Sequence, residues 1–103
     1  MSGSDENVTT LAGYQSEARR TINRGLTDDQ RLLDASAGLA EEAGEVLSHV
    51  RKHLLQGRPL DRDAVVLELG DALWCLAIAA DTLGVTLDEV VRRNVEKLRS
   101  RFP

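Results

Sequence analysis

The 103-residue sequence has few aromatic residues, a single cysteine and no excess of basic side chains. Aromatic residues make up only 3% of the chain, so its apolar 42% is mostly leucine, valine and alanine, which is typical of helix bundles. The lone Cys75 excludes an internal disulfide and a multi-cysteine zinc site, and it fits a reducing compartment. A formal charge of −4 argues against a protein that coats nucleic acid, because such proteins neutralise phosphates with basic residues.

Long apolar runs and targeting patterns are also missing. The longest apolar run, residues 72–80, is far shorter than the roughly 20 residues that span a bilayer. The first residues lack the basic start and apolar core of a secretory signal. We therefore expect a soluble cytoplasmic protein that binds neither a membrane nor a nucleic acid polymer. Residues 1–7 are polar and aperiodic, which predicts a disordered tail before a single helical domain over residues 8–103.

Apolar residues recur every three or four positions in four segments, and no segment alternates with a period of two. This pattern predicts an all-α fold, a bundle of four helices. We expect the helices over residues 8–22, 27–57, 61–84 and 86–102. Capping boxes beginning at Thr27 and Thr86 mark two of the starts, and Gly25, Gly57 and Gly84 are expected to end helices.

Two acidic pairs lie at the margins of apolar helical faces. Glu42 and Glu45 are three residues apart on the second expected helix, and Glu68 and Asp71 repeat this spacing on the third. Helices packed antiparallel would bring these four carboxylates together, and the group would need cations to offset its repulsion. Oxygen ligands of this kind select Mg²⁺ or Mn²⁺. Acidic residues at such margins are usually just solvated, but two matched pairs weigh against that interpretation.

The acidic motifs and their surroundings resemble those of a known enzyme family. Glu41-Glu42-Ala-Gly-Glu45 is followed after 22 residues by Glu68-Leu-Gly-Asp71, and the segments LAEEAGEVL, LELGDALW and NVEKLRSRFP surround or follow them. Over roughly residues 11–103 the chain is similar to the MazG-like all-α nucleoside triphosphate pyrophosphohydrolases. The resemblance implies an Mg²⁺-dependent enzyme that converts an NTP or dNTP to the monophosphate and pyrophosphate, with house-cleaning of non-canonical nucleotides as one role it suggests.

The same resemblance assigns roles to the acidic residues. It implies that Glu42, Glu45, Glu68 and Asp71 are the metal ligands. It also implies that Glu41 is an auxiliary ligand or a base that orients the attacking water, so that Glu41, Glu42 and Glu45 form the catalytic set. The helical wheel separates Glu41 from the other glutamates, because Glu41 falls nearly opposite the apolar arc.

Polar residues within the apolar stripe of the last expected helix are further candidates. Asn94 lies inside the stripe, and Lys97 and Arg101 flank it. An amide bonded to nearby backbone, with basic groups complementing the helix C-terminus, would explain these residues equally well. The resemblance instead implies that they bind the triphosphate.

Three residues are candidate nucleoside contacts, namely Gln15, Tyr14 and Trp74. Either aromatic ring could stack on a base, although packing in a core or an interface is the commoner fate of such rings. His49 and His53 are four residues apart near the end of the second expected helix. They are predicted to be surface residues, because a helix C-terminus favours a cation and no H-E-x-x-H motif is present.

The length of the chain suggests self-association. It carries one set of acidic motifs, whereas some members of the family carry two, so one copy would leave part of the pocket unbuilt. We therefore expect a homodimer or a dimer of dimers. The alternative function is a non-catalytic helical protein that binds a nucleotide or another partner. A di-iron bundle is disfavoured, because such sites use Glu-x-x-His and this chain has none.

Overall fold

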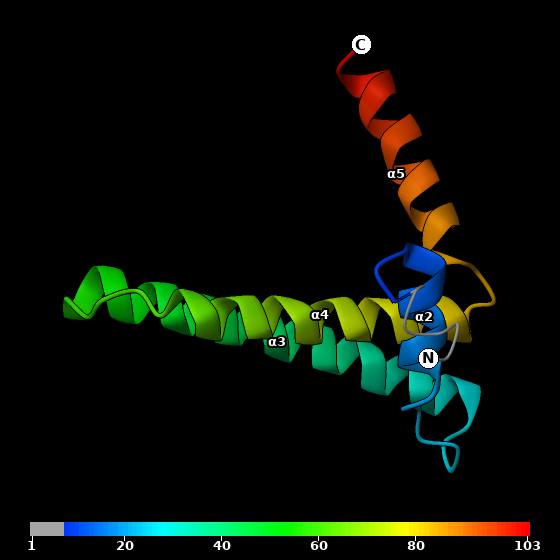
Figure 1. The fold of residues 1–103 in the computed structure, drawn as a ribbon, viewed down its shortest axis with the longest axis horizontal. Helices are drawn as coiled ribbons and strands as arrows, with labels where there is room; N and C mark the ends of the chain where they lie inside the picture. The colour runs from blue at the N-terminus through cyan, green and yellow to red at the C-terminus, as the bar shows by residue number, and fades with distance from the viewer. Residues whose placement is uncertain (1–7) are drawn as a thin grey trace.

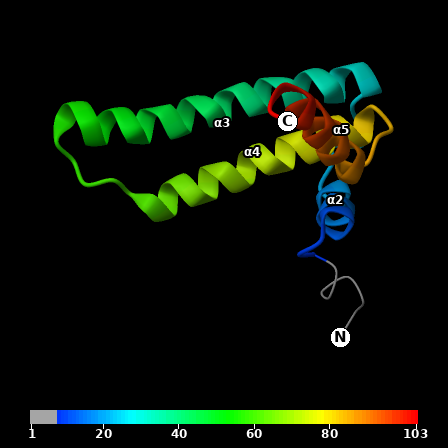
Figure 2. The ribbon, with the colours of Figure 1, turned by 90° about the horizontal axis from the view of Figure 1, so that it is seen from above.

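The computed structural model describes residues 8–103, and this part of the chain contains helices and no strand. The helices are α2 (Leu11–Arg19), α3 (Asp28–Gln56), α4 (Arg62–Thr82) and α5 (Leu87–Arg101). α3 and α4 form a long antiparallel hairpin, α2 packs beside the C-terminal part of α4, and α5 projects away from the hairpin (Figures 1 and 2). The all-α class is confirmed. None of these helices is both long and apolar enough to cross a membrane.

Local capping chemistry explains where the long helices begin and end. Thr27 forms the expected capping box with Gln30: its hydroxyl accepts the Gln30 N–H, and the Gln30 side chain accepts the Thr27 N–H. The Thr86 hydroxyl likewise accepts a backbone N–H at the start of α5. Gly57 and Gly84 follow α3 and α4 with φ of 68° and 75°, a backbone region that glycine adopts without strain. These expected boundaries are confirmed.

The first helix is shorter than expected at both ends. It begins at Leu11 rather than at Val8, because the hydroxyl of Thr10 accepts the Gly13 N–H and caps it. The prediction that Gly25 ends this helix is wrong. The chain leaves the helix at Arg20, and Gly25 has no positive φ; its N–H is instead bonded to the Asn23 side chain. Apolar spacing alone could not reveal either change.

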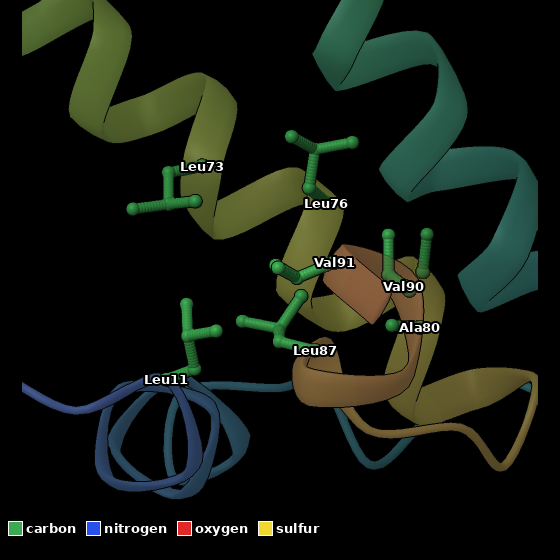
Figure 3. Close-up of a pocket in the computed structure, with 8 residues that line it drawn as sticks. Leu11, Leu73, Leu76, Ala80, Leu87, Val90 and Val91 are labelled. Atoms are coloured by element: carbon green, nitrogen blue, oxygen red, sulfur yellow. The ribbon is translucent and has the colours of Figure 1, made fainter. Parts of the chain in front are cut away.

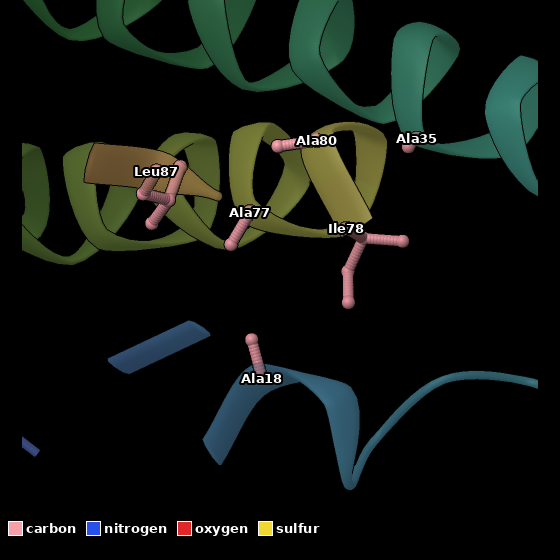
Figure 4. Packing of buried hydrophobic residues seen from close by; sticks show 6 residues of the cluster. All are labelled: Ala18, Ala35, Ala77, Ile78, Ala80 and Leu87. Atoms are coloured by element: carbon pink, nitrogen blue, oxygen red, sulfur yellow. The ribbon is translucent and has the colours of Figure 1, made fainter. Parts of the chain in front are cut away.

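The core is built mostly from small side chains where α2, α3, α4 and the start of α5 meet (Figure 4). Its buried members are Ala18, Ala35, Ala77, Ile78, Ala80 and Leu87. No described residue with a large side chain is completely buried. Small residues let helix backbones approach closely, but they bury little apolar area, so this core contributes modestly to stability.

Apolar spacing divides α4 into a main face with Leu69 and Leu76 and a secondary face with Trp74 and Ile78. Much of the main face, which this pattern predicts to form the core, is instead exposed. Leu69 and Leu76 are 54% and 44% exposed, whereas Ile78, from the face expected to be secondary, is 3% exposed. The reason is that α2 covers the side of α4 that bears Trp74 and Ile78. Periodicity identified both faces correctly but could not tell which one the chain itself would cover.

Gly38 permits a close approach of α3 to α4, and this makes a test of their packing. A Cβ at Gly38 would lie 2.9 Å from the Cys75 Sγ, whereas a Cβ at Gly44 would meet nothing within 4 Å. Gly44→Ala should stabilise the protein by about 0.5–1 kcal/mol, the usual gain within a helix. Gly38→Ala should destabilise it by about 1–3 kcal/mol through overpacking.

The free energy of unfolding from urea titrations measures both effects. Combining Gly38→Ala with Cys75→Ala should recover part of the loss, since the Sγ is then absent. If Gly38→Ala is as stabilising as Gly44→Ala, the two helices are not as close as described.

Candidate metal centre

Three carboxyl groups converge between the middle of α3 and the middle of α4. Glu42, Glu68 and Asp71 each place one oxygen so that the three atoms lie within 4.8 Å of one another. Glu68 and Asp71 share a face of α4 because they are three residues apart. Oxygens around one octahedral Mg²⁺ lie roughly 3–4 Å apart, as its bond length of about 2.1 Å requires. Small side-chain rotations would therefore bring all three oxygens onto one cation.

The environment of Glu42 disfavours ionisation of its carboxyl group. Its Oε2 is shielded from water and has no hydrogen-bond partner among the described residues. The pKa of Glu42 is raised from 4.5 to about 7, chiefly because its carboxyl group can share a proton with that of Glu68. Desolvation and the negative charges of Glu68, Asp71 and Glu41 add to the rise. Such a group needs either a proton or a cation, which is the donor chemistry of a magnesium site.

The remaining predicted ligands, Glu45 and Glu41, are exposed and lie outside this converging group. Glu45 is about one helical turn beyond Glu42 on α3. Glu41 lies close enough for its charge to raise the pKa of Glu42. The structure thus brings together three of the four residues expected to bind metal, and the roles of Glu45 and Glu41 stay predictions.

α2 brings Tyr14 toward the acidic group. The pKa of Tyr14 is raised mainly by burial and then by the negative charge of Asp71. Trp74 instead packs against the core, and its Nε1 donates to the Thr21 hydroxyl at 2.6 Å. Both rings have packing roles, and nucleoside stacking by either one stays a prediction.

Gln15 of α2 is buried, and its amide joins α2 to the connection before α5 and to the start of α5. Its Nε2 donates to the carbonyl of Val85 and its Oε1 accepts the N–H of Leu87, both at 2.9 Å. Nearby, the Nε of Arg19 donates to Asp81 at 2.8 Å. These bonds fix α2 against the connection between α4 and α5. The predicted contact of Gln15 with the nucleoside gains no support from these bonds and stays a prediction.

The polar residues of α5 do not reach the acidic group within one chain. Among the described residues α5 contacts α2 and α4 but not α3. Asn94, Lys97 and Arg101 are all exposed on the projecting part of the helix (Figure 1). Their predicted contact with a triphosphate would need an arrangement that one chain does not provide, and it stays a prediction.

Cys75 is a neighbour of the acidic group that the sequence did not place there. Its side chain is buried, as predicted for a small apolar residue, and burial raises the pKa of its thiol. The charges of Glu42 and Asp71 raise it further, so this thiol stays protonated beside them. The histidines play no part in the group, and the Nδ1 of His53 lies 2.6 Å from the carbonyl of Arg58 at the end of α3.

Comparisons with known proteins bear on this site. The family model for the MazG nucleotide pyrophosphohydrolase domain matches residues 30–103, which include α3, α4 and α5 but not α2. Gene 37 protein of Mycobacterium phage L5 is 41% identical over 68 residues, covering 62% of this chain and 60% of that protein. Uncharacterized protein YvdC of Bacillus subtilis (strain 168) is 36% identical over 73 residues, covering 62% of this chain and 69% of YvdC. The chain thus spans about three fifths of the first relative. No solved structure matches.

The raised pKa of Glu42 makes the stability of the metal-free protein depend on pH. The folded state holds this proton up to a pKa of about 7, whereas the unfolded state loses it near 4.5. The stabilising effect is therefore complete below pH 4.5 and is lost as the pH rises to about 7. In EDTA, we expect the melting temperature to fall across this window.

Glu42→Gln should flatten this dependence because glutamine does not titrate. Glu96→Gln, on the exposed side of α5, is the matched control and should keep the wild-type slope. An unchanged slope in Glu42→Gln would show that this carboxyl group does not hold the proton.

Proposed function

The chain belongs to the MazG nucleotide pyrophosphohydrolase domain family, and we propose that it hydrolyses a nucleoside triphosphate or its deoxy form to the monophosphate and pyrophosphate with Mg²⁺. The observation that carries this proposal is the convergence of Glu42, Glu68 and Asp71, with one Glu42 oxygen shielded and unpartnered. Phosphoryl transfer of this type depends mainly on positioning and charge stabilisation, so it needs no serine or cysteine nucleophile.

In this proposal some of the acidic residues bind the metal ion, and one accepts a proton from the attacking water. Glu42, Glu68 and Asp71 would hold the cation, and Glu45 would serve as a fourth ligand. Bound Mg²⁺, or Mn²⁺ in its place, would neutralise the phosphates and lower the pKa of a bound water. Glu41 orients the attacking water and accepts its proton. The water oxygen bonds to phosphorus as the bond to the departing pyrophosphate breaks.

Residues outside the acidic group complete the substrate contacts in this proposal. Tyr14 borders the group from α2, which is supported by the effect of the Asp71 charge on its pKa. Trp74 and Gln15 help to hold α2 in place, and in this proposal both also contact the nucleoside directly. Asn94, Lys97 and Arg101 supply the amide and the further positive charge that bind the triphosphate. Non-canonical nucleotides are proposed as the substrates of a house-cleaning role in the cytoplasm.

Release of pyrophosphate from a nucleotide panel is the direct test. With Mg²⁺, the purified protein should release pyrophosphate rather than phosphate from at least one canonical or oxidised nucleotide. Glu42→Gln and Asp71→Asn should each lower kcat/KM by more than the roughly 10- to 100-fold typical of losing an outer-shell partner of a metal.

Asp63→Asn provides the control, because Asp63 is an exposed acid in the first turn of α4, away from the group. It should retain wild-type activity. Nucleotide binding by calorimetry without turnover would instead favour the non-catalytic alternative. Full activity in both Glu42→Gln and Asp71→Asn would exclude the proposed site.

A further inference from the structure

Trp74 is the only tryptophan of the chain and lies one turn of α4 after Asp71. Residues three apart are neighbours on the surface of a helix. Helical side chains also lean toward the preceding turn, which for Trp74 is the turn that bears Asp71. The ring is half-buried, with part of it packed against the core that includes Ala18 and Ile78. The part of the ring outside the core is therefore placed next to the acidic group.

The indole N–H of Trp74 is bound by Thr21, which follows the C-terminal end of α2. The Nε1 donates to the Thr21 hydroxyl oxygen at 2.6 Å, and this hydroxyl donates to the carbonyl of Ala18 at 2.7 Å. An indole N–H can only donate, and the Thr21 hydrogen is already used by Ala18, so the direction of both bonds is fixed. Two consecutive hydrogen bonds thus join the ring to the backbone of α2.

Apolar packing alone does not fix the position of α2 on α4. The buried contact of α2 is made by a single methyl group, that of Ala18, which packs with Ala77 and Ile78 (Figure 4). At the other end of α2, Leu11 borders an apolar hollow of about 300 Å³ that Leu87 of α5 also lines (Figure 3). Side chains that do not fill a space make few contacts across it, so they constrain the tilt of α2 only weakly.

Side-chain hydrogen bonds supply the missing constraint at two places along α4. Gln15 binds the connection to α5 and its first residue, and Arg19 binds the last turn of α4. Thr21 binds about two turns earlier on α4, at Trp74. The bonds therefore attach α2 on both sides of the Ala18 contact, and the bond of Thr21 is on the side toward the acidic group.

We infer that Thr21 is a positioning residue whose hydroxyl holds the Trp74 ring in one orientation, so that the ring forms a fixed wall beside the acidic group. Thr21 acts through the ring and is assigned no contact with a nucleotide. The consequence for substrate binding rests on the proposed function, whereas the holding of the ring does not.

The ring depends on this bond because its packing is incomplete. A tryptophan side chain has several staggered rotamers, and a half-buried ring can reach more than one of them. A nucleotide that contacts the ring would then have to select one orientation. When the competent orientation is only partly populated, the apparent affinity falls by that fraction. A neutral hydrogen bond changes such a population by about 2- to 10-fold.

Time-resolved fluorescence anisotropy in EDTA tests the holding of the ring, since the signal comes from Trp74 alone. Thr21→Val keeps the shape of the side chain but removes the hydroxyl, so it should add nanosecond motion of the indole and increase its quenching by acrylamide. Thr21→Ser keeps the hydroxyl and should retain the wild-type signal. The matched control is Thr82→Val, which removes a hydroxyl bonded to the carbonyl of Ile78 and should leave the indole unchanged.

The kinetic constants for the nucleotide with the highest turnover in the panel give the functional readout. Thr21→Val should raise KM by about 2- to 10-fold. It should leave kcat unchanged, because the acidic residues that would hold the metal are intact. Thr21→Ser should have the wild-type KM, and so should Thr82→Val.

Unchanged indole motion in Thr21→Val would overturn the inference. So would a Thr21→Ser variant as mobile as Thr21→Val, or a fall in kcat without a change in KM. If Thr21→Val loses its helical circular dichroism signal, the wild type decides: its indole N–H must exchange with water more slowly than that of free tryptophan. A wild type without turnover would count against the proposed function alone, and the anisotropy would still decide whether Thr21 holds the ring.

Discussion

Three carboxyl groups confined between two helices set the main constraint on this molecule. Glu42, Glu68 and Asp71 are held together by the packing of α3 on α4, which the absence of a side chain at Gly38 makes close. Their mutual repulsion opposes that packing, and it adds to the rise in the pKa of Glu42 that comes chiefly from a proton shared with Glu68. The hairpin therefore keeps a site whose free energy falls when a cation enters. Much of the remaining structure, including α2 with Tyr14, is arranged around this space.

Features set by short-range chemistry could be predicted from the sequence. The capping box at Thr27 and the left-handed glycine at Gly57 depend only on neighbouring residues, and both are confirmed. The pairing of Glu68 with Asp71 follows from helical geometry in the same way. For this reason the long helices and three members of the acidic group could be predicted from the sequence.

Features set by tertiary packing could not be predicted. The helical wheel placed Leu69 and Ile78 on different faces of α4, but which face α2 covers depends on contacts that no local pattern encodes. Glu45 lies three residues after Glu42, and α3 and α4 diverge in that direction (Figure 2). Glu45 therefore lies outside the converging group. The sequence singled out Gln15 as a candidate nucleoside contact. Its backbone partners, some 70 positions away, could not be identified from the sequence.

The bonds of Gln15 also bear on how the chain is made. They tie the connection before α5 to α2, the first described helix. α2 emerges early from the ribosome, but the Val85 carbonyl and the Leu87 N–H, which bind Gln15, emerge only after the α3–α4 hairpin has been synthesised. Until then the Gln15 amide lacks its native hydrogen-bond partners, and a helix as short as α2 is not stable on its own. α2 can therefore gain these bonds only after the α3–α4 hairpin and the connection that follows it have been synthesised.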